Sequence, residues 1–340
     1  MSAEAVAEAI ARAVEGEALE APAMEAAMEA ILAGEASAPQ IAALAVALRM
    51  RGESAEELGA AARVLRRRAV PFERADGERL LDTCGTGGDR SGTFNISTTA
   101  AVVVAACGLK VAKHGNRSVS SRSGSADVLE ALGIRLDGDA GAARRSLDAL
   151  GIAFFFAPAF HGALKHAAPV RRELGLRSFF NLLGPLANPA SASHQLLGVY
   201  DPARLRQIAE VLAELGVEGA WVVHGEGGLD EVSPCGPTRV ATLRDGRVEE
   251  TTLEPTDFGL EPVAFDSLVG GDAAANARIT RAVLAGEGGG PRAAVVINTA
   301  AALCASGAED DPRAARERAS AAIDRGDAAA LLERWAGRRA

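Results

Sequence analysis

Apolar residues recur every three or four positions through residues 1–70, a spacing that places them on one face of a helix. The pattern predicts helices over parts of residues 3–14, 22–33, 38–51 and 54–68. The third helix begins at Ser37-Ala38-Pro39, where a cap-type residue precedes an early proline. Pro71 ends the pattern, so residues 71–77 are predicted to form a linker.

The pattern of apolar residues changes at Leu80, where short apolar runs begin to alternate with helical segments. Strands are predicted at residues 80–83, 109–113, 152–156, 195–199 and 221–223. Helices are predicted at 96–107, at 140–150 and at 202–215, and one more helix is predicted to end near residue 132. Such alternation is typical of an α/β domain with a mainly parallel sheet. Asp245-Gly246 separates two alternating runs and predicts a β-hairpin. Helices are expected again after Ala273, with residues 286–290 as a glycine-rich loop.

Composition narrows the possible functions. Apolar residues make up 48% of the chain and charged residues 24%, which is typical of a soluble globular protein. The formal net charge is −9, which argues against a nucleic-acid-binding protein. No secretory signal is recognisable, and the longest apolar run, residues 100–107, is too short to span a bilayer. Four widely spaced cysteines indicate reduced thiols, so we expect a cytoplasmic protein.

A glycine-rich segment, Asp82-Thr83-Cys84-Gly85-Thr86-Gly87-Gly88-Asp89, follows the first predicted strand. Glycines let backbone N–H groups turn inward and let an anion approach closely, although an ordinary tight turn would look similar. It matches neither the Walker loop nor the GxGxxG fingerprint. The polar run Thr93–Thr99 stands directly before the next helix, where it can cap that helix or bind an anion.

A second polar loop, Lys113-His114-Gly115-Asn116-Arg117-Ser118-Val119-Ser120-Ser121, follows the next predicted strand. Open α/β sheets place ligands at the carboxyl ends of their strands. Two cations, an amide and several serines suit a phosphorylated sugar, whereas ordinary surface charge is the alternative.

Asp230-Glu231 lies in a third loop, flanked by glycines and a Ser-Pro pair. Carboxylates in a loop can turn to one place and hold Mg²⁺, an ion that keeps several waters and bridges to phosphates. A solvated acidic pair is the alternative. Farther back in the chain, Arg171 and Arg172 are candidates for binding an anion, and the residues alone do not choose between them.

Taken in this order, with Pro169-Val170-Arg171-Arg172-Glu173-Leu174-Gly175, these motifs resemble the anthranilate phosphoribosyltransferases over nearly the whole chain. The resemblance implies a helical domain at residues 1–75 and a nucleoside phosphorylase/phosphoribosyltransferase-like α/β domain at 76–340. Part of about 165–190 would pack back onto the helical domain, with the active site in the cleft between the domains. It also implies a cytoplasmic homodimer formed through the helical domains.

The implied reaction joins the phosphoribosyl group of phosphoribosyl pyrophosphate (PRPP) to the amine of anthranilate and releases pyrophosphate. This reaction is a step of tryptophan biosynthesis, and the resemblance implies two Mg²⁺ ions per active site. Magnesium would bind Ser97, Asp230 and Glu231, and anthranilate would contact Gly85, Asn116 and Arg171. PRPP would contact Gly85, Gly88, Asp89, Thr93, Asn95, Ile96, Ser97, Thr98, Lys113, His114, Gly115, Asn116, Arg117, Ser118, Val119, Ser120, Ser121 and Ser125.

The sequence offers no convincing Ser-His-Asp or Cys-His arrangement, so catalysis is expected to come from positioning and electrostatic stabilisation. Asp89 is expected to contact solvated metal or a ribose hydroxyl, because a carboxylate would repel pyrophosphate. Three alternatives remain. A pyrimidine-type nucleoside phosphorylase would use inorganic phosphate and need no Asp-Glu pair. A nucleic-acid-binding relative conflicts with the net charge, and a helical partner protein leaves the glycine and serine loops unexplained.

Overall fold

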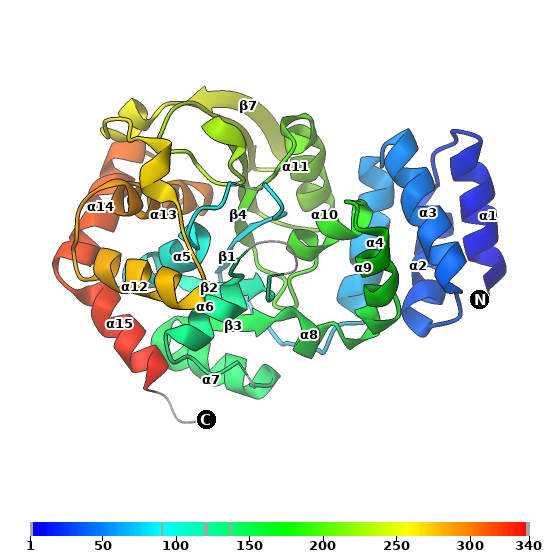
Figure 1. Ribbon diagram of the computed structural model, residues 1–340, viewed down its shortest axis with the longest axis horizontal. Helices are drawn as coiled ribbons and strands as arrows, with labels where there is room; N and C mark the ends of the chain where they lie inside the picture. The colour runs from blue at the N-terminus through cyan, green and yellow to red at the C-terminus, as the bar shows by residue number, and fades with distance from the viewer. Residues whose placement is uncertain (1–2, 90, 119–121, 137, 338–340) are drawn as a thin grey trace.

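The computed structural model describes residues 3–89, 91–118, 122–136 and 138–337. A helical bundle comes first and forms one end of the molecule (Figure 1). Ser37 and Ser54 cap the last two of its helices, each accepting a hydrogen bond from the backbone three residues on, which confirms the predicted helix starts. The helices are α1 (Ala3–Val14), α2 (Ala21–Ala33), α3 (Ala38–Arg51) and α4 (Ala55–Arg67).

A buried glutamate fastens the connections of this bundle. The carboxylate of Glu57 is fully buried on α4. It accepts the backbone N–H groups of Leu19 at 2.7 Å and Ser54 at 2.8 Å, and it pairs with Arg51. Burying a carboxylate is unfavourable unless donors satisfy it, and here three groups do so. Glu57 therefore joins the α1–α2 connection to the α3–α4 junction.

In the described part of the chain, seven strands form one sheet in the order β3-β2-β1-β4-β5-β6-β7. The first five are parallel, and β6 and β7 form the predicted antiparallel hairpin. Its turn has Asp245 at φ 51° and Gly246 at φ 73°, the left-handed pair that a tight hairpin requires. The strands are β1 (Leu80–Gly85), β2 (Lys110–Gly115), β3 (Ile152–Phe156), β4 (His194–Gly198), β5 (Gly219–Gly225), β6 (Thr238–Arg244) and β7 (Arg247–Leu253).

Helices cover both faces of the sheet (Figure 1). Val222 and Val223 are neighbours on β5 and so point to opposite faces. Val222 packs in a cluster with α11 and the bundle, whereas Val223 packs in a cluster with α5 and α13. The α-helices are α5 (Ile96–Ala106), α6 (Ser125–Ala131), α7 (Ala140–Leu150), α8 (Ala157–Phe160), α9 (Ala168–Leu174), α10 (Phe179–Leu186), α11 (Leu205–Glu214), α12 (Ala273–Leu284), α13 (Gly290–Ala305), α14 (Pro312–Asp324) and α15 (Asp327–Ala336). Short 3₁₀ helices are η1 (Gly162–His166), η2 (Pro202–Arg204), η3 (Glu226–Gly228), η4 (Pro255–Phe258) and η5 (Phe265–Leu268).

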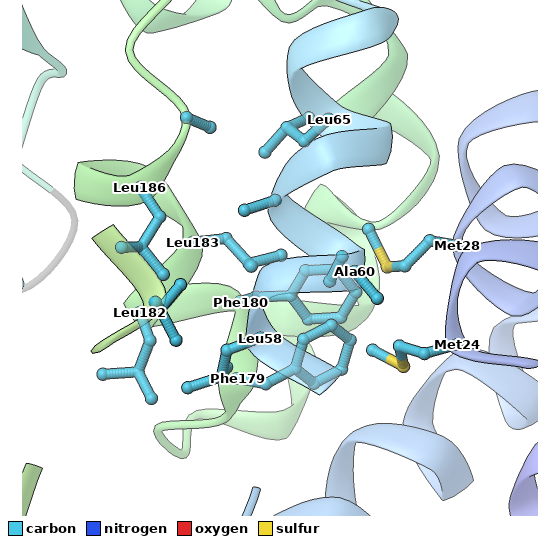
Figure 2. Close-up of a cluster of buried hydrophobic side chains, with 14 of the residues drawn as sticks. Met24, Met28, Leu58, Ala60, Leu65, Phe179, Phe180, Leu182, Leu183 and Leu186 are labelled. Carbon is cyan, nitrogen blue, oxygen red and sulfur yellow. The ribbon is translucent and has the colours of Figure 1, made fainter. Parts of the chain in front are cut away.

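The bundle and the sheet share one hydrophobic core. Helices α9 and α10 pack against α3 and α4 of the bundle. The stacked rings of Phe179 and Phe180, 4.1 Å apart, belong to one hydrophobic cluster with apolar side chains of α4 and with the two methionines of α2, Met24 and Met28 (Figure 2). Arg66 of α4 crosses the same boundary and donates to the carbonyl of Leu186 at 2.8 Å. Arg66 is half-buried, and burial lowers the pKa of its guanidinium to about 10.

The fold class predicted from the sequence is confirmed, with differences in detail. The helix expected over 202–215 is divided, because Asp201 starts the 3₁₀ turn η2 before α11 begins. The strand expected at 221–223 is longer, and the glycine-rich loop is shorter because Gly290 already starts α13. Glycine and proline punctuate both places, which makes such boundaries hard to predict. None of the helices in these residue ranges is long and apolar enough to cross a membrane.

Replacing Glu57 with alanine is expected to lower the free energy of unfolding by about 3–5 kcal/mol, because Arg51 and two N–H groups would lose their buried acceptor. Urea unfolding followed by circular dichroism measures the change. Glu8→Ala, at an exposed position of α1, is the control and should change stability by less than about 0.5 kcal/mol. Equal unfolding midpoints for the two variants would contradict the role given to Glu57.

Candidate functional site

Four neighbouring parallel strands end in glycine. They are β1, β2, β4 and β5, and they end at Gly85, Gly115, Gly198 and Gly225. We call this edge of the sheet the carboxyl edge. A side chain at Gly85 or Gly198 would overlap Asp230, and one at Gly225 would come within 2.6 Å of the carbonyl of Glu231. The missing side chains therefore make room for the Asp230-Glu231 loop to lie directly on the strand ends.

The glycine-rich loop Gly85–Asp89 is held by its neighbours at this edge. The N–H of Thr86 donates to the carbonyl of Gly198 at 2.9 Å, and its hydroxyl accepts the N–H of Tyr200 at 3.1 Å. Gly87 donates its N–H to the Asp230 carboxylate at 2.7 Å. Among the described residues, no acceptor is found for the N–H groups of Gly88 and Asp89. The loop therefore offers unpaired donors to an anion.

The two carboxylates of the third loop lie beside both the glycine loop and the start of α5. Asp230 accepts from Gly87, and Glu231 accepts the N–H of Ser97 at 3.1 Å. Burial, and next the charge of Asp89, raise the pKa of Asp230 to about 7. Burial and the charge of Asp230 raise the pKa of Glu231 to about 8. Crowded carboxylates of this kind gain from a bound cation.

These carboxylates fit magnesium better than a metal that needs a full protein cage. Within the described ranges, no group of three or more His, Cys, Asp or Glu side chains is placed to hold a metal ion. Mg²⁺ usually binds through one or two carboxylates and keeps water and substrate phosphates as its other ligands. Asp230 and Glu231, with the hydroxyl of Ser97 nearby, are therefore a suitable donor set.

Lys113 supplies a buried positive charge behind the same loops. Its side chain is 1% exposed, donates to the carbonyl of Thr83 and lies 3.5 Å from the hydroxyl of Ser97. Burial lowers the pKa of Lys113, and the carboxylate of Asp82 opposes that shift most strongly. Asp82 in turn accepts from the His114 N–H at 3.1 Å and from Asn188 at 2.8 Å. These contacts fix the end of β2 against β1.

The polar residues at the start of α5 come together, but most of their polar atoms already have protein partners. The Asn95 amide donates to Ser123 at 3.2 Å and accepts from Asn276 at 2.9 Å. Thr98 donates to Ser125 at 3.0 Å. Ile96 is buried, and Thr93 shares a hydrogen bond with Ser91. In this structure Asn95 joins three segments, a role that its position in the sequence did not reveal.

Arg117 and His114 do not bring charge to the carboxyl edge in this structure. Arg117 is exposed and pairs with Glu130 and Asp127 of α6. The His114 ring is buried against His161, with ring centres 5.2 Å apart. Its burial, and then the nearby His161, lower the pKa of His114 to about 3, so the ring is neutral at pH 7.

The remaining described residues of the second loop make contacts within the loop, with α6 and with β3. Asn116 is exposed and accepts the N–H of Arg117 at 2.7 Å, while the Ser118 N–H donates to Asp127 at 3.0 Å. A side chain at Gly115 would come within 2.8 Å of Phe154, so this glycine is needed for packing. Val119, Ser120 and Ser121 lie outside the described residues.

The structure distinguishes Arg171 from Arg172 as candidates for binding an anion, which the residues alone did not do. Arg171 on α9 is half-buried, and its guanidinium lies 5.5 Å from the ring centre of Phe180. Burial lowers its pKa, and it forms no ion pair within the part of the chain described here. Arg172 is exposed. Arg171 is therefore the arginine better prepared to bind an anion.

Two further residues lie at the glycine loop without having been predicted. Arg177, between α9 and α10, packs against Gly88, and its guanidinium lies 4.1 Å from the ring centre of Tyr200. Gly198 lies near the end of the predicted strand 195–199 and Tyr200 follows it, so the rule that ligands bind at carboxyl ends could have pointed to them. Arg177 follows no motif, and its placement depends on how α10 packs.

Cavities also occur away from this edge. Two cavities of about 270 Å³ and 240 Å³ lie elsewhere. The second is lined by Leu80, Lys110 and His194, where β1, β2 and β4 begin. Those positions are at the opposite ends of the strands from the loops described above.

Comparisons with known proteins agree over almost the whole chain. Residues 7–69 match the helical bundle domain of a glycosyl transferase family, and residues 77–329 match its a/b domain. The chain is 54% identical to the anthranilate phosphoribosyltransferase of Moorella thermoacetica, over 92% of each chain. A crystal structure of anthranilate phosphoribosyltransferase from Thermus thermophilus is similar with a TM-score of 0.90 and 43% identity, over 96% of this chain and 98% of that one. The enzyme from Saccharomyces cerevisiae in complex with PRPP and Mg is similar with a TM-score of 0.85 and 29% identity, over 93% and 92%.

Gly198→Ala is expected to destabilise the protein by about 1–3 kcal/mol and to weaken Mg²⁺ binding, because the new methyl group would displace the main chain of Asp230. Thermal unfolding and titration calorimetry with Mg²⁺ measure the two effects. Gly288→Ala is the matched control, since a methyl group there would meet open space. Normal Mg²⁺ affinity in Gly198→Ala would show that the strand ends do not set the position of the acidic pair.

Proposed function

The chain belongs to the anthranilate phosphoribosyltransferase family, and we propose that the carboxyl edge is where it carries out that family's reaction. It transfers the phosphoribosyl group of PRPP to the amine of anthranilate, a step of tryptophan biosynthesis. The observation that carries the assignment of the site is the contact between the acidic pair and two anion-binding segments. Asp230 holds Gly87, and Glu231 holds Ser97.

PRPP binds, in this proposal, across the loops of the carboxyl edge. Its pyrophosphate binds the N–H groups of Gly88 and Asp89 that lack acceptors in the described residues. Lys113 contributes positive charge from its buried position behind the same loops. The sugar phosphate meets the second polar loop and the hydroxyl of Ser125. Arg117 reaches the phosphate only after it leaves Glu130 and Asp127, so its contribution to PRPP binding is smaller than its charge suggests.

Magnesium is held by Asp230 and Glu231, and the hydroxyl of Ser97 helps to hold one of two ions. When bound, the metal neutralises the pyrophosphate and so makes it a better leaving group. The raised pKa values of the two carboxylates support this assignment, because bare carboxylates in such a place are poorly stabilised at neutral pH. Asp89, which lies close enough to raise the pKa of Asp230, contacts the hydrated metal or a ribose hydroxyl.

Anthranilate binds beside this edge, with its carboxylate on Arg171 and its ring near Asn116 and Gly85. The reaction breaks the bond between C1 of the ribose and the pyrophosphate oxygen, and a bond forms from C1 to the amine nitrogen. The nitrogen then gives up one proton, which the departing pyrophosphate or solvent water takes. An aromatic amine is neutral at pH 7, so the chain needs no strong base. Its residues instead orient the two substrates and stabilise the charge that develops as pyrophosphate leaves.

The protein acts as a cytoplasmic homodimer formed through its helical domains. Apolar side chains exposed near the ends of bundle helices support such a contact, namely Val14 at 69% and Met50 at 83% exposure. The four cysteines are free thiols, which agrees with a reducing compartment.

Replacing both metal candidates, as Asp230→Asn with Glu231→Gln, is expected to lower the rate by about 100-fold or more and to remove its dependence on Mg²⁺. The assay follows the loss of anthranilate fluorescence after PRPP is added, first with Mg²⁺ and then with EDTA. Glu226→Gln, an exposed change in the same loop, should behave like the unaltered protein. A double variant with the normal magnesium curve would remove these residues from the site.

Arg171→Ala is expected to raise the KM for anthranilate by about 10- to 100-fold, as the loss of a charge-assisted hydrogen bond would do. The KM for PRPP should change by less than about threefold, since that substrate is held by other loops. Initial rates with each substrate varied in turn provide the comparison, and Arg172→Ala is the control. Equal increases in both KM values would contradict a specific contact with anthranilate.

A further inference from the structure

Arg177 carries a positive charge that no protein group balances in the described ranges of the chain. Its side chain is half-buried in the connection between α9 and α10. Its guanidinium forms no hydrogen bond or ion pair with those residues. Other arginines of this acidic protein, such as Arg144 and Arg204, pair closely with carboxylates. An unpaired, half-buried guanidinium in such a protein indicates that a mobile anion is its partner.

The position of Arg177 identifies where that anion would bind. A Cβ atom built on Gly88 would lie 2.8 Å from the guanidinium, so the arginine packs against the bare backbone of the glycine loop. The N–H groups of Gly88 and Asp89, which lack acceptors among the described residues, belong to the same short segment. Three donors without acceptors thus lie together at one loop.

Tyr200 keeps the guanidinium in this place. Its ring centre lies 4.1 Å from Cζ of Arg177, a distance at which a guanidinium is attracted to the face of an aromatic ring. The backbone N–H of Tyr200 also donates to the hydroxyl of Thr86. A stacked guanidinium leaves its edge free to donate hydrogen bonds. Tyr200 therefore connects the arginine to the loop that it faces.

We propose that Arg177 binds the pyrophosphate group of PRPP, together with the N–H groups of Gly88 and Asp89. The forked donors of arginine match the oxygens of a phosphate group. The other anionic groups of the substrates have other partners in the proposed function: the sugar phosphate has the second polar loop, and the carboxylate of anthranilate has Arg171. This inference rests on the proposed function and adds a residue from the α9–α10 connection to its pyrophosphate site.

Titration calorimetry with Mg²⁺ present tests the proposal on Arg177→Ala, Arg177→Lys and the control Arg172→Ala. We expect Arg177→Ala to bind PRPP and free pyrophosphate about 10- to 100-fold more weakly, with binding of ribose 5-phosphate unchanged. Its KM for anthranilate should stay within about twofold of the original value. Arg177→Lys should recover part of the lost affinity, because it keeps the charge but not the forked geometry.

The outcomes separate this inference from the proposed function. Failure of the unaltered protein to bind PRPP would overturn the proposed function itself. If the unaltered protein binds PRPP and Arg177→Ala binds it equally well, Arg177 is not a pyrophosphate ligand. A rise in the anthranilate KM alone would assign Arg177 to the carboxylate and overturn the proposal.

A second pair of variants decides the matter if Arg177→Ala does not fold. Tyr200→Leu removes the aromatic face and should weaken pyrophosphate binding, whereas Tyr200→Phe keeps the face and should bind normally. Equal pyrophosphate affinity in these two variants would contradict the proposed support of Arg177 by Tyr200.

Discussion

The site depends on the absence of side chains at the paired ends of β1 and β4. Gly85 and Gly198 are partners in the sheet, and Asp230 lies over both of them. Because no Cβ atom intervenes, the main chain of Asp230 can lie on the strand ends, and its carboxylate reaches the N–H of Gly87. Glu231 then reaches the start of α5 at Ser97. One steric requirement at two glycines thus brings together segments that are more than a hundred residues apart.

Charge balance explains why this arrangement calls for a ligand. Asp82 is buried and Asp230 and Glu231 are half-buried at the carboxyl edge, and Lys113 is a buried cation beside them. Lys113 is already shared with Asp82, so it compensates the acidic pair only in part. A divalent cation would relieve the repulsion between the two carboxylates, and the anion that this cation carries would meet the unpaired donors of the glycine loop. Metal and anion therefore stabilise the site together better than either would alone.

The sequence predicted the fold class and the main loops because both depend on local signals. Alternating runs and the Asp245-Gly246 turn predicted the hairpin, and the glycines after the first apolar run marked the end of β1. Such local signals do not predict which partners an individual side chain will bind. Arg117 pairs with α6, and Asn95 binds Ser123 and Asn276, through contacts between distant segments. Arg177 reaches Gly88 only because α10 packs on the bundle, and no short sequence motif predicts that packing.

The shared hydrophobic core connects the bundle to the chemistry. Phe179 and Phe180 of α10 are buried against the bundle, and Arg177 stands two residues before Phe179. Arg66 holds the other end of α10 through the carbonyl of Leu186. Since α10 is fixed at both ends by bundle residues, the bundle determines where Arg177 lies relative to the glycine loop. The helical domain therefore acts on the site through the placement of α10 and does not need to contact the metal candidates itself.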